Sequence, residues 1–171
     1  MSANEAEQFE RIVLPHLDAA YNLARWFAGN DHDAQDIAQE ACVRAFRFIG
    51  GHRGGDARAW LLAIVRNTAF SWLKKNRPAM VVSIDDDALA EIEDQNVAAH
   101  SAFSADKKVL RAALESLPLE FREAIVLREL EGLSYKEIAE VAEVPVGTVM
   151  SRLARARRQL QNHFARKEGE K

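Results

Sequence analysis

Four arginines lie close together near the end of the chain: Arg152, Arg155, Arg157 and Arg158. A guanidinium group can neutralise a backbone phosphate or donate two hydrogen bonds to the edge of a guanine. The segment has helical spacing, so we expect the arginines on one side of a helix and these apolar residues on the other: Val149, Leu153, Ala156 and Leu160. The pattern favours a DNA-binding helix, and the alternative is an amphipathic helix with a solvated basic face.

Acidic residues form a second pattern in the first third of the chain. Asp33, Asp36 and Glu40 follow one another at spacings of three and four, which places their carboxylates on one side of a helix. Such a strip suits a basic partner helix. The alternative is a solvated acidic face on which Asp33 only favours the helix start.

Catalytic and metal-binding patterns are missing from the sequence. The five histidines and one cysteine show no metal-ligand spacing, and the chain has neither a glycine-rich phosphate loop after a strand nor a nucleophile elbow. We therefore expect no enzyme activity, no metal and no cofactor. Cys42 cannot form an internal disulfide, and we interpret it as a buried structural thiol.

The elements that must position these residues are all predicted to be helices, because apolar residues recur at spacings of three and four without sustained alternation. The expected helices cover residues 4–27 with a break before Pro15, 32–48, 57–75, 104–116, 118–131, 135–142 and 148–164. Expected buried faces include Ile37, Ala41, Ala45 and Phe48 in one helix, and Phe121, Ile125, Val126 and Leu130 in another. The fold class is therefore all-α.

Local signals set the helix ends. Gly29 is expected to end the first stretch, with Asn30 or Asp31 as the next cap, and Asp56 caps the helix from Ala57. After Gly132, Ser134 and Glu137 form a capping box. The short helix that follows, a turn with Val144 directed to the core, and the final helix together predict a helix-turn-helix, with Ala139 where the two helices cross closely.

Composition indicates a soluble globular chain, with 48% hydrophobic and 29% charged residues. No apolar run approaches the roughly 20 residues that span a bilayer, and the acidic start does not resemble a secretion signal, so we expect no membrane insertion and a cytoplasmic location. The net charge is −3, but residues 76–106 carry seven acidic side chains and one basic one. This acidic, weakly periodic stretch predicts a flexible linker over residues 78–104 between two small helical domains.

The last third of the chain resembles region four of extracytoplasmic-function sigma factors, the subunits that lend bacterial RNA polymerase its promoter specificity. The resemblance is carried by Leu117-Pro118, by Gly132 to Ala139, by Val144 to Val149, and by Ser151 to Leu153 with Arg155 to Arg157. It implies that the minus-thirty-five promoter element is read by Thr148, Met150, Ser151, Ala154 and Arg155, with Arg152 and Arg158 in support. Met150 departs from the family, which often has Lys or Arg there; methionine can pack on a thymine methyl but cannot pair with a phosphate.

The segment from Asp33 to Glu40 resembles the acidic helix of region two in the same family. The resemblance implies that Asp33, Asp36, Gln39 and Glu40 bind a coiled-coil clamp of the polymerase large subunit. Gln35 stands where the family usually has Glu, so one charge is missing.

The segment from Trp60 to Asn67 resembles the part of region two that handles the minus-ten element. Capturing an unstacked base needs a pocket beside cations that follow the DNA backbone. The resemblance assigns this work to His52, Arg53, Arg58, Arg66, Asn67 and Lys74, whereas Trp60 is interpreted as a packing residue. The chain is thus identified as a sigma factor with region two in residues 1–77, an acidic linker in 78–104 and region four in 105–171.

Its expected partners are core RNA polymerase, through the large-subunit clamp helices and the flap, promoter DNA, and an anti-sigma factor. The resemblance also suggests that the linker threads through the polymerase cleft, although a solvated tether would explain its acidity as well. The alternative function is a helix-turn-helix regulator that binds duplex DNA without polymerase, which would leave the acidic helix and the Trp60 segment without a task.

Overall fold

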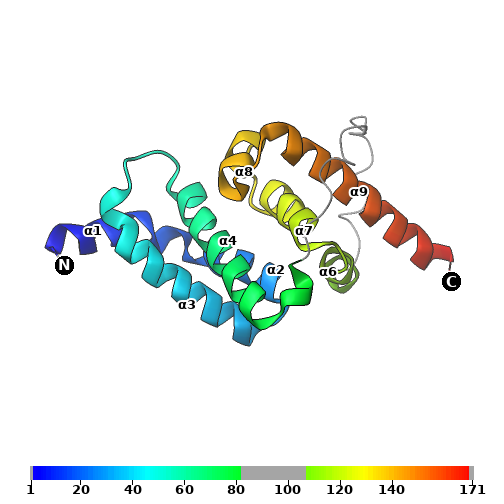
Figure 1. Cartoon of the computed structure of the whole chain (residues 1–171), viewed down its shortest axis with the longest axis horizontal. Helices are drawn as coiled ribbons and strands as arrows, with labels where there is room; N and C mark the ends of the chain where they lie inside the picture. Colours follow the sequence, from blue (N-terminus) through cyan, green and yellow to red (C-terminus); the bar gives the residue numbers. More distant parts are fainter. Residues whose placement is uncertain (1, 82–106, 170–171) are drawn as a thin grey trace. The chain divides into compact units, whose positions relative to one another are not determined.

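The computed structural model describes residues 2–81 and 107–169 (Figure 1). Every regular element within these two ranges is a helix, which confirms the predicted all-α class. The described chain divides into two compact units, with residues 2–81 in the first and residues 107–139 and 144–169 in the second. Most of the predicted acidic linker, from residue 82 on, lies outside the described residues, so its predicted role is not addressed by the structure.

The first unit is built around three helices that pack against one another, α2, α3 and α4 (Figure 1). Its elements are α1 (Ala3–Ile12), η1 (Leu14–His16), α2 (Leu17–Ala28), α3 (Asp31–Phe48), η2 (Ile49–Gly51), α4 (Ala57–Asn76) and η3 (Pro78–Met80). The fully buried side chains include Leu23, Phe27, Ile37, Leu61 and Leu62. Phe27 also meets Phe70 of α4 edge to face, with ring centroids 5.5 Å apart.

The helix ends of this unit follow the local signals in the sequence. The break near Pro15 is confirmed, because Pro15 lies in the short turn η1 between α1 and α2. Gly29 ends α2 in the left-handed conformation, with φ +82°, and the Asn30 side chain then accepts a hydrogen bond of 2.9 Å from the backbone N–H of Asp33. Asp56 caps α4 in the same way, through the backbone N–H of Ala59.

Arg77, just after α4, ties the three core helices together. One guanidinium nitrogen donates to the backbone carbonyl of Ala28 at 2.6 Å, and another donates to the carboxylate of Asp33. The end of α4 is thereby held against the junction of α2 and α3. This contact fixes the position in which α3 begins.

The second unit contains α6 (Lys107–Glu115), α7 (Leu119–Ile125), the π-helical turn η5 (Val126–Leu130), α8 (Tyr135–Ala142) and α9 (Val146–Gly169). The buried Arg122 donates to the carbonyls of Leu114, Glu115 and Leu117, which are left without helical partners where α6 ends. Burial lowers the pKa of Arg122. The guanidinium therefore serves as an internal connector of α6 and α7.

The predicted start of the helix-turn-helix is confirmed by its backbone conformation and its capping hydrogen bonds. Gly132 has φ +68°, and the capping box follows: the Glu137 N–H donates to Ser134 Oγ at 3.1 Å, and the Ser134 N–H donates to Glu137 Oε1 at 3.0 Å. Ala139 is buried, whereas Val144 is only half-buried. The final helix is longer than predicted, since it begins at Val146 and continues to Gly169.

Two residues predicted to be buried are exposed. Phe48 is 60% exposed because it is the last residue of α3, where the chain turns into η2 and the buried Ile49 takes the inward place. Leu130 is 43% exposed because residues 126–130 form a π-helical turn. The wider turn rotates the side chain away from the stripe expected for α-helical spacing. Among the described residues, no helix is long and apolar enough to cross a bilayer.

Candidate functional sites

The acidic strip on α3 divides into one internal carboxylate and two outward ones. Asp33 accepts a hydrogen bond of 2.9 Å from Asn30 Nδ2 and is paired with Arg77. The Asn30 hydrogen bond and the positive charge of Arg77 hold the pKa of Asp33 below its usual value, despite some desolvation. Asp33 therefore anchors the start of α3.

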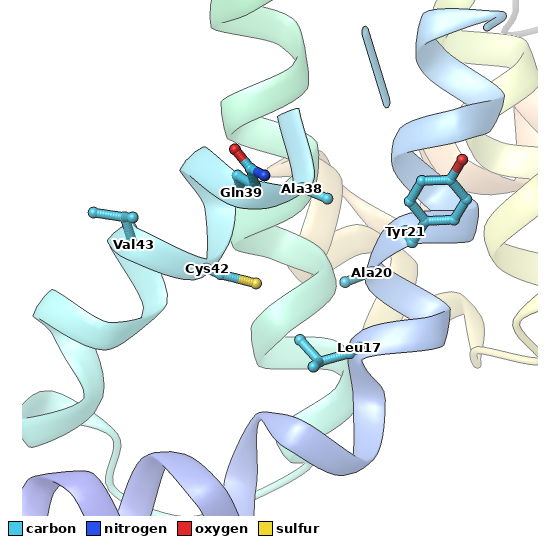
Figure 2. A pocket seen from close by; sticks show the side chains of 7 residues that line it. All are labelled: Leu17, Ala20, Tyr21, Ala38, Gln39, Cys42 and Val43. Atoms are coloured by element: carbon cyan, nitrogen blue, oxygen red, sulfur yellow. The ribbon is translucent and has the colours of Figure 1, made fainter. Parts of the chain in front are cut away.

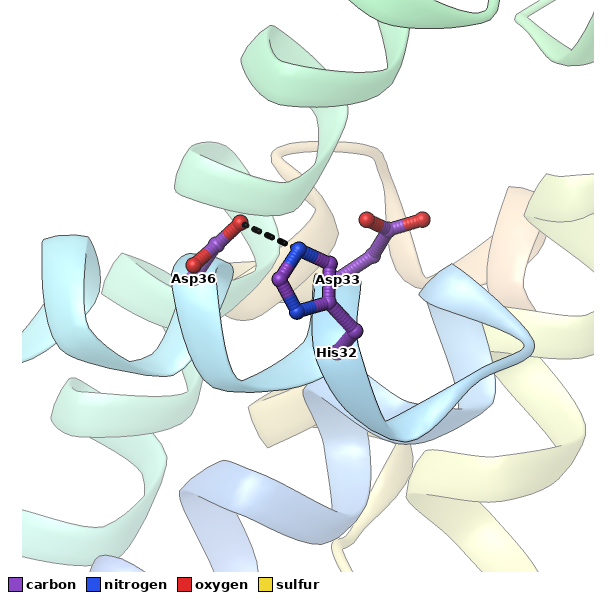
Figure 3. Close-up of side chains that lie close together, drawn as sticks. All are labelled: His32, Asp33 and Asp36. Atoms are coloured by element: carbon purple, nitrogen blue, oxygen red, sulfur yellow. Dashed lines mark ion pairs between the residues drawn. The ribbon is translucent and has the colours of Figure 1, made fainter.

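Asp36 and Glu40 are exposed and make weaker contacts on the surface of α3. Asp36 lies 3.9 Å from His32 Nε2, and a dashed line marks this pair in Figure 3. Glu40 pairs with Arg44 at 2.7 Å. His32, Asp33 and Asp36 lie close enough together to surround an ion. We assign no metal to them, because Arg77 already supplies the positive charge beside Asp33.

An apolar groove of about 460 Å³ adjoins these carboxylates, between α2 and α3 (Figure 2). Its lining residues are Leu17, Ala20, Tyr21, Ala38, Gln39, Cys42 and Val43. The Cys42 and Ala20 side chains point toward one another across it. Cys42 is half-buried, whereas the sequence predicted a buried thiol. Its partial burial raises the pKa of the thiol.

Gln39 connects the groove to the carboxylates, because Asp36, Gln39, Glu40 and Val43 share one face of α3 at helical spacing. Sequence reasoning missed Leu17 and Val43, which are exposed apolar residues of this surface. The sequence did indicate Val43, because it lies one helical turn after Gln39 and so shares a face with Asp36 and Gln39. The combined surface is acidic along one edge and apolar along the other.

The residues predicted to handle the minus-ten element lie in the loop before α4 and along α4. His52 packs on Trp60 with ring centroids 4.9 Å apart, which agrees with the interpretation of Trp60 as a packing residue. Arg53 is exposed in the loop, and Arg58 is half-buried in the first turn of α4.

Further along α4, Arg66 lies 3.9 Å above the ring of Phe70 and donates to Asn67 Oδ1 at 3.3 Å. Lys74 is exposed and lies two turns beyond Arg66, so both cations are on the same side of the helix. The structure therefore brings Arg66, Asn67 and Lys74 together along one helix. His52 and Arg53 precede its first turn.

The predicted contacts to the minus-thirty-five element lie on α9. Met150 is 45% exposed, Arg158 is exposed, and the remaining residues are half-buried: Thr148, Ser151, Ala154 and Arg155. The guanidinium of Arg155 lies 5.7 Å from the ring centroid of Phe121. Ser151 Oγ donates to the carbonyl of Gly147 at 3.0 Å.

Arg152 differs from this prediction. It is only 5% exposed, and its guanidinium lies 3.5 Å from Glu120 Oε2 of α7. The spacing explains this, because Arg152 lies three residues after the buried Val149 and four before the buried Ala156, on their face of α9. Arg157 is likewise paired with Glu129 at 3.1 Å. The prediction that all four arginines lie opposite the apolar residues is therefore wrong.

Comparisons with known proteins match both units in order. Residues 12–78 match Sigma-70 region 2, and residues 107–160 match Sigma-70, region 4. The chain is 38% identical to the ECF RNA polymerase sigma factor SigE of Mycolicibacterium smegmatis, over 95% of this chain and 63% of that protein. It is 37% identical to the RNA polymerase sigma-H factor of Pseudomonas aeruginosa, over 87% of this chain and 82% of that one. It is 38% identical to the ECF RNA polymerase sigma-E factor of Haemophilus influenzae, over 82% and 78% of the two chains.

A solved structure shows the same fold over nearly the whole chain. It is the sigma factor RpoE in complex with the anti-sigma factor NepR from Bartonella quintana, with a TM-score of 0.71 and 28% identity. The likeness covers 92% of this chain and 96% of that one.

Proposed function

The chain belongs to the extracytoplasmic-function sigma factors of the sigma-70 family, non-enzymatic subunits that direct RNA polymerase to initiate at specific promoters, and we propose from this membership which surfaces of the chain perform each step. The observation that carries the proposal is the order of the two matches, region 2 at residues 12–78 and region 4 at 107–160. Residues 1–77 form the polymerase-docking and minus-ten domain, 78–104 the acidic linker, and 105–171 the minus-thirty-five domain. An ordinary helix-turn-helix regulator would use only the last of these.

Docking on core polymerase uses the exposed face of α3 and the groove beside it. Asp36, Gln39 and Glu40 contact the partner, while Asp33 acts as a positioning residue because Arg77 and Asn30 hold its carboxylate. The surface suits a helix with apolar side chains on one edge and basic ones on the other. The clamp helices of the polymerase large subunit are the partner we assign to it.

A charge reversal at Asp36 tests this docking surface. Asp36→Lys is expected to weaken binding to core polymerase, because it places a cation opposite a basic partner, and the affinity is best measured by competition with a labelled wild-type chain. Glu10→Lys is the matched control, since Glu10 is also exposed but lies on α1, away from the groove. Equal core affinity for wild type and Asp36→Lys, with both chains folded by circular dichroism, would remove α3 from the interface.

Promoter DNA is contacted by both domains. We assign the minus-ten element to His52, Arg53, Arg58, Arg66, Asn67 and Lys74, because cations beside a loop can follow a single strand. The minus-thirty-five element is assigned to Thr148, Met150, Ser151, Ala154, Arg155 and Arg158 of α9, with Arg152 supporting that helix from inside the unit. The second domain also contacts the polymerase flap, so that both domains engage polymerase at once.

An anti-sigma factor is the proposed regulator of this chain. The relative from Bartonella quintana was crystallised with one, and its fold matches 92% of this chain. The proposed site of action is the cytoplasm, where core polymerase and promoter DNA are found.

A further inference from the structure

The first six residues of α9 carry no charged side chain. Residues 146–151 read Val-Gly-Thr-Val-Met-Ser, and the first arginine of the helix, Arg152, faces Glu120 inside the unit. Arg155 is the next cation, more than two turns from the start of the helix. Any base edges that meet the beginning of α9 therefore meet uncharged side chains.

Two large apolar side chains are exposed within these six residues. Val146 is 41% exposed and Met150 is 45% exposed, and they are four positions apart, so they adjoin on one face of the helix. Their polar neighbour Ser151 donates its hydroxyl proton to the carbonyl of Gly147. Apart from the half-buried Thr148, the side chains that this part of α9 exposes offer mainly apolar contact.

We propose that Val146 and Met150 recognise thymine methyl groups in the upstream promoter element. In a helix-turn-helix, residues near the start of the second helix contact base edges in the major groove. Thymine is the only standard base that presents a methyl group there, and an apolar side chain distinguishes it by contact. The unbranched, polarisable side chain of Met150 can adapt to such a methyl group.

Charge around the patch supports duplex DNA as its occupant. Arg155 and Arg158 follow on α9, and Lys136 is exposed on α8, the first helix of the helix-turn-helix. These cations belong to the same helix-turn-helix as Val146 and Met150 and can bind duplex phosphates while the two apolar side chains meet the bases. The inference rests on the proposed function and adds that the upstream element must contain thymine at the positions that Val146 and Met150 contact.

Replacing thymine by uracil removes only the methyl group and therefore tests this contact. The experiment uses the full chain with core polymerase, a promoter identified by its transcription start, and one deoxyuridine at a time in the upstream element on either strand. For wild type, we expect at least one thymine at which the substitution weakens promoter binding about fourfold, the effect of one buried methyl group. Met150→Ala is expected to lose that sensitivity at one thymine.

Leu130→Ala is the matched control, because Leu130 is 43% exposed in the same unit but lies outside α9. It is expected to keep the full deoxyuridine effect. The proposal is overturned if wild type shows no such effect, if the element contains no thymine, or if Met150→Ala and Val146→Ala both keep the wild-type sensitivity. These results presuppose a functioning holoenzyme, whereas a failure of the proposed function would appear earlier, as no promoter-specific start with core polymerase.

Discussion

Arginine side chains serve two separate tasks in this chain, and burial distinguishes them. Arg122, Arg152 and Arg157 each bind carbonyls or a carboxylate within the second unit. Arg158 is exposed on α9, whereas Arg155 is half-buried, with its guanidinium 5.7 Å from the ring centroid of Phe121. A guanidinium can bind partners inside the unit or DNA outside it, because it offers five donors on a long apolar stem. The number of arginines in α9 therefore overstates the positive charge that the helix offers to DNA.

Truncation of Arg152 and of Arg155 should therefore have different effects. Arg152→Ala leaves Glu120 without its cation and is expected to lower the free energy of unfolding by about 3 kcal/mol. Arg155→Ala is expected to lower affinity for the upstream element by about 1–3 kcal/mol and to relax its base preference. Urea unfolding and holoenzyme promoter binding measure the two effects, with Arg158→Ala as the stability control. An Arg152→Ala chain of unchanged stability would contradict the internal role.

The low pKa of Asp33 predicts a pH-dependent contribution to stability. The ionised carboxylate is favoured in the folded state by the Asn30 hydrogen bond and by Arg77. Its stabilising effect is therefore complete above the ordinary aspartate pKa of about 4 and is lost as the pH falls through the lowered folded-state pKa. We expect Asp33→Asn to be less stable than wild type at pH 7, and the gap to narrow below about pH 4. A gap that stays constant in urea unfolding down to acidic pH would show that ionisation of Asp33 contributes nothing.

At the scale of elements, the sequence predicts most boundaries because the signals are local. Gly29, Asn30, Asp56 and the Ser134–Glu137 box each act within a few residues, and the structure has all of them in the predicted roles. Leu130 was misplaced because a π-helical turn depends on packing around the segment, which α-helical spacing does not anticipate.

The candidate sites were predictable to a lesser extent. The family resemblance identified the helices α3 and α9 as candidate sites. However, Asp33 is paired with Arg77 and Arg152 with Glu120, and each partner lies more than 30 residues away along the chain. These pairs hold Asp33 and Arg152 within their units. The groove between α2 and α3 likewise depends on how two helices pack. Such long-range contacts are not visible in the spacing of one helix.

Cys42 reports on the groove between α2 and α3, since it is the single cysteine of the chain and lines that groove. Burial raises the pKa of the thiol, so little thiolate is present near neutral pH and alkylation by iodoacetamide should be slow. Saturating core polymerase should slow the reaction further, as followed by mass spectrometry. Asp36→Lys at the same concentrations should lose this protection. An unchanged alkylation rate with bound wild type would place the groove outside the interface.

At the scale of the whole molecule, the two units offer different surfaces. The first unit offers an acidic and apolar face for a protein, together with cations along α4. The second offers a helix-turn-helix whose long α9 carries exposed apolar and basic residues. Joining two contacts through one chain raises the effective concentration of the second once the first is made. Polymerase docking and promoter recognition are expected to reinforce each other for this reason.

In vitro transcription on fragmented genomic DNA tests the central claim most directly, with purified core polymerase in the presence and absence of this chain and with all transcript starts mapped. The account predicts discrete new starts that share two spaced upstream elements and that disappear with Asp36→Lys. The absence of new starts, despite binding of the chain alone to duplex DNA, would contradict the account and would indicate a helix-turn-helix regulator that works without becoming a polymerase subunit.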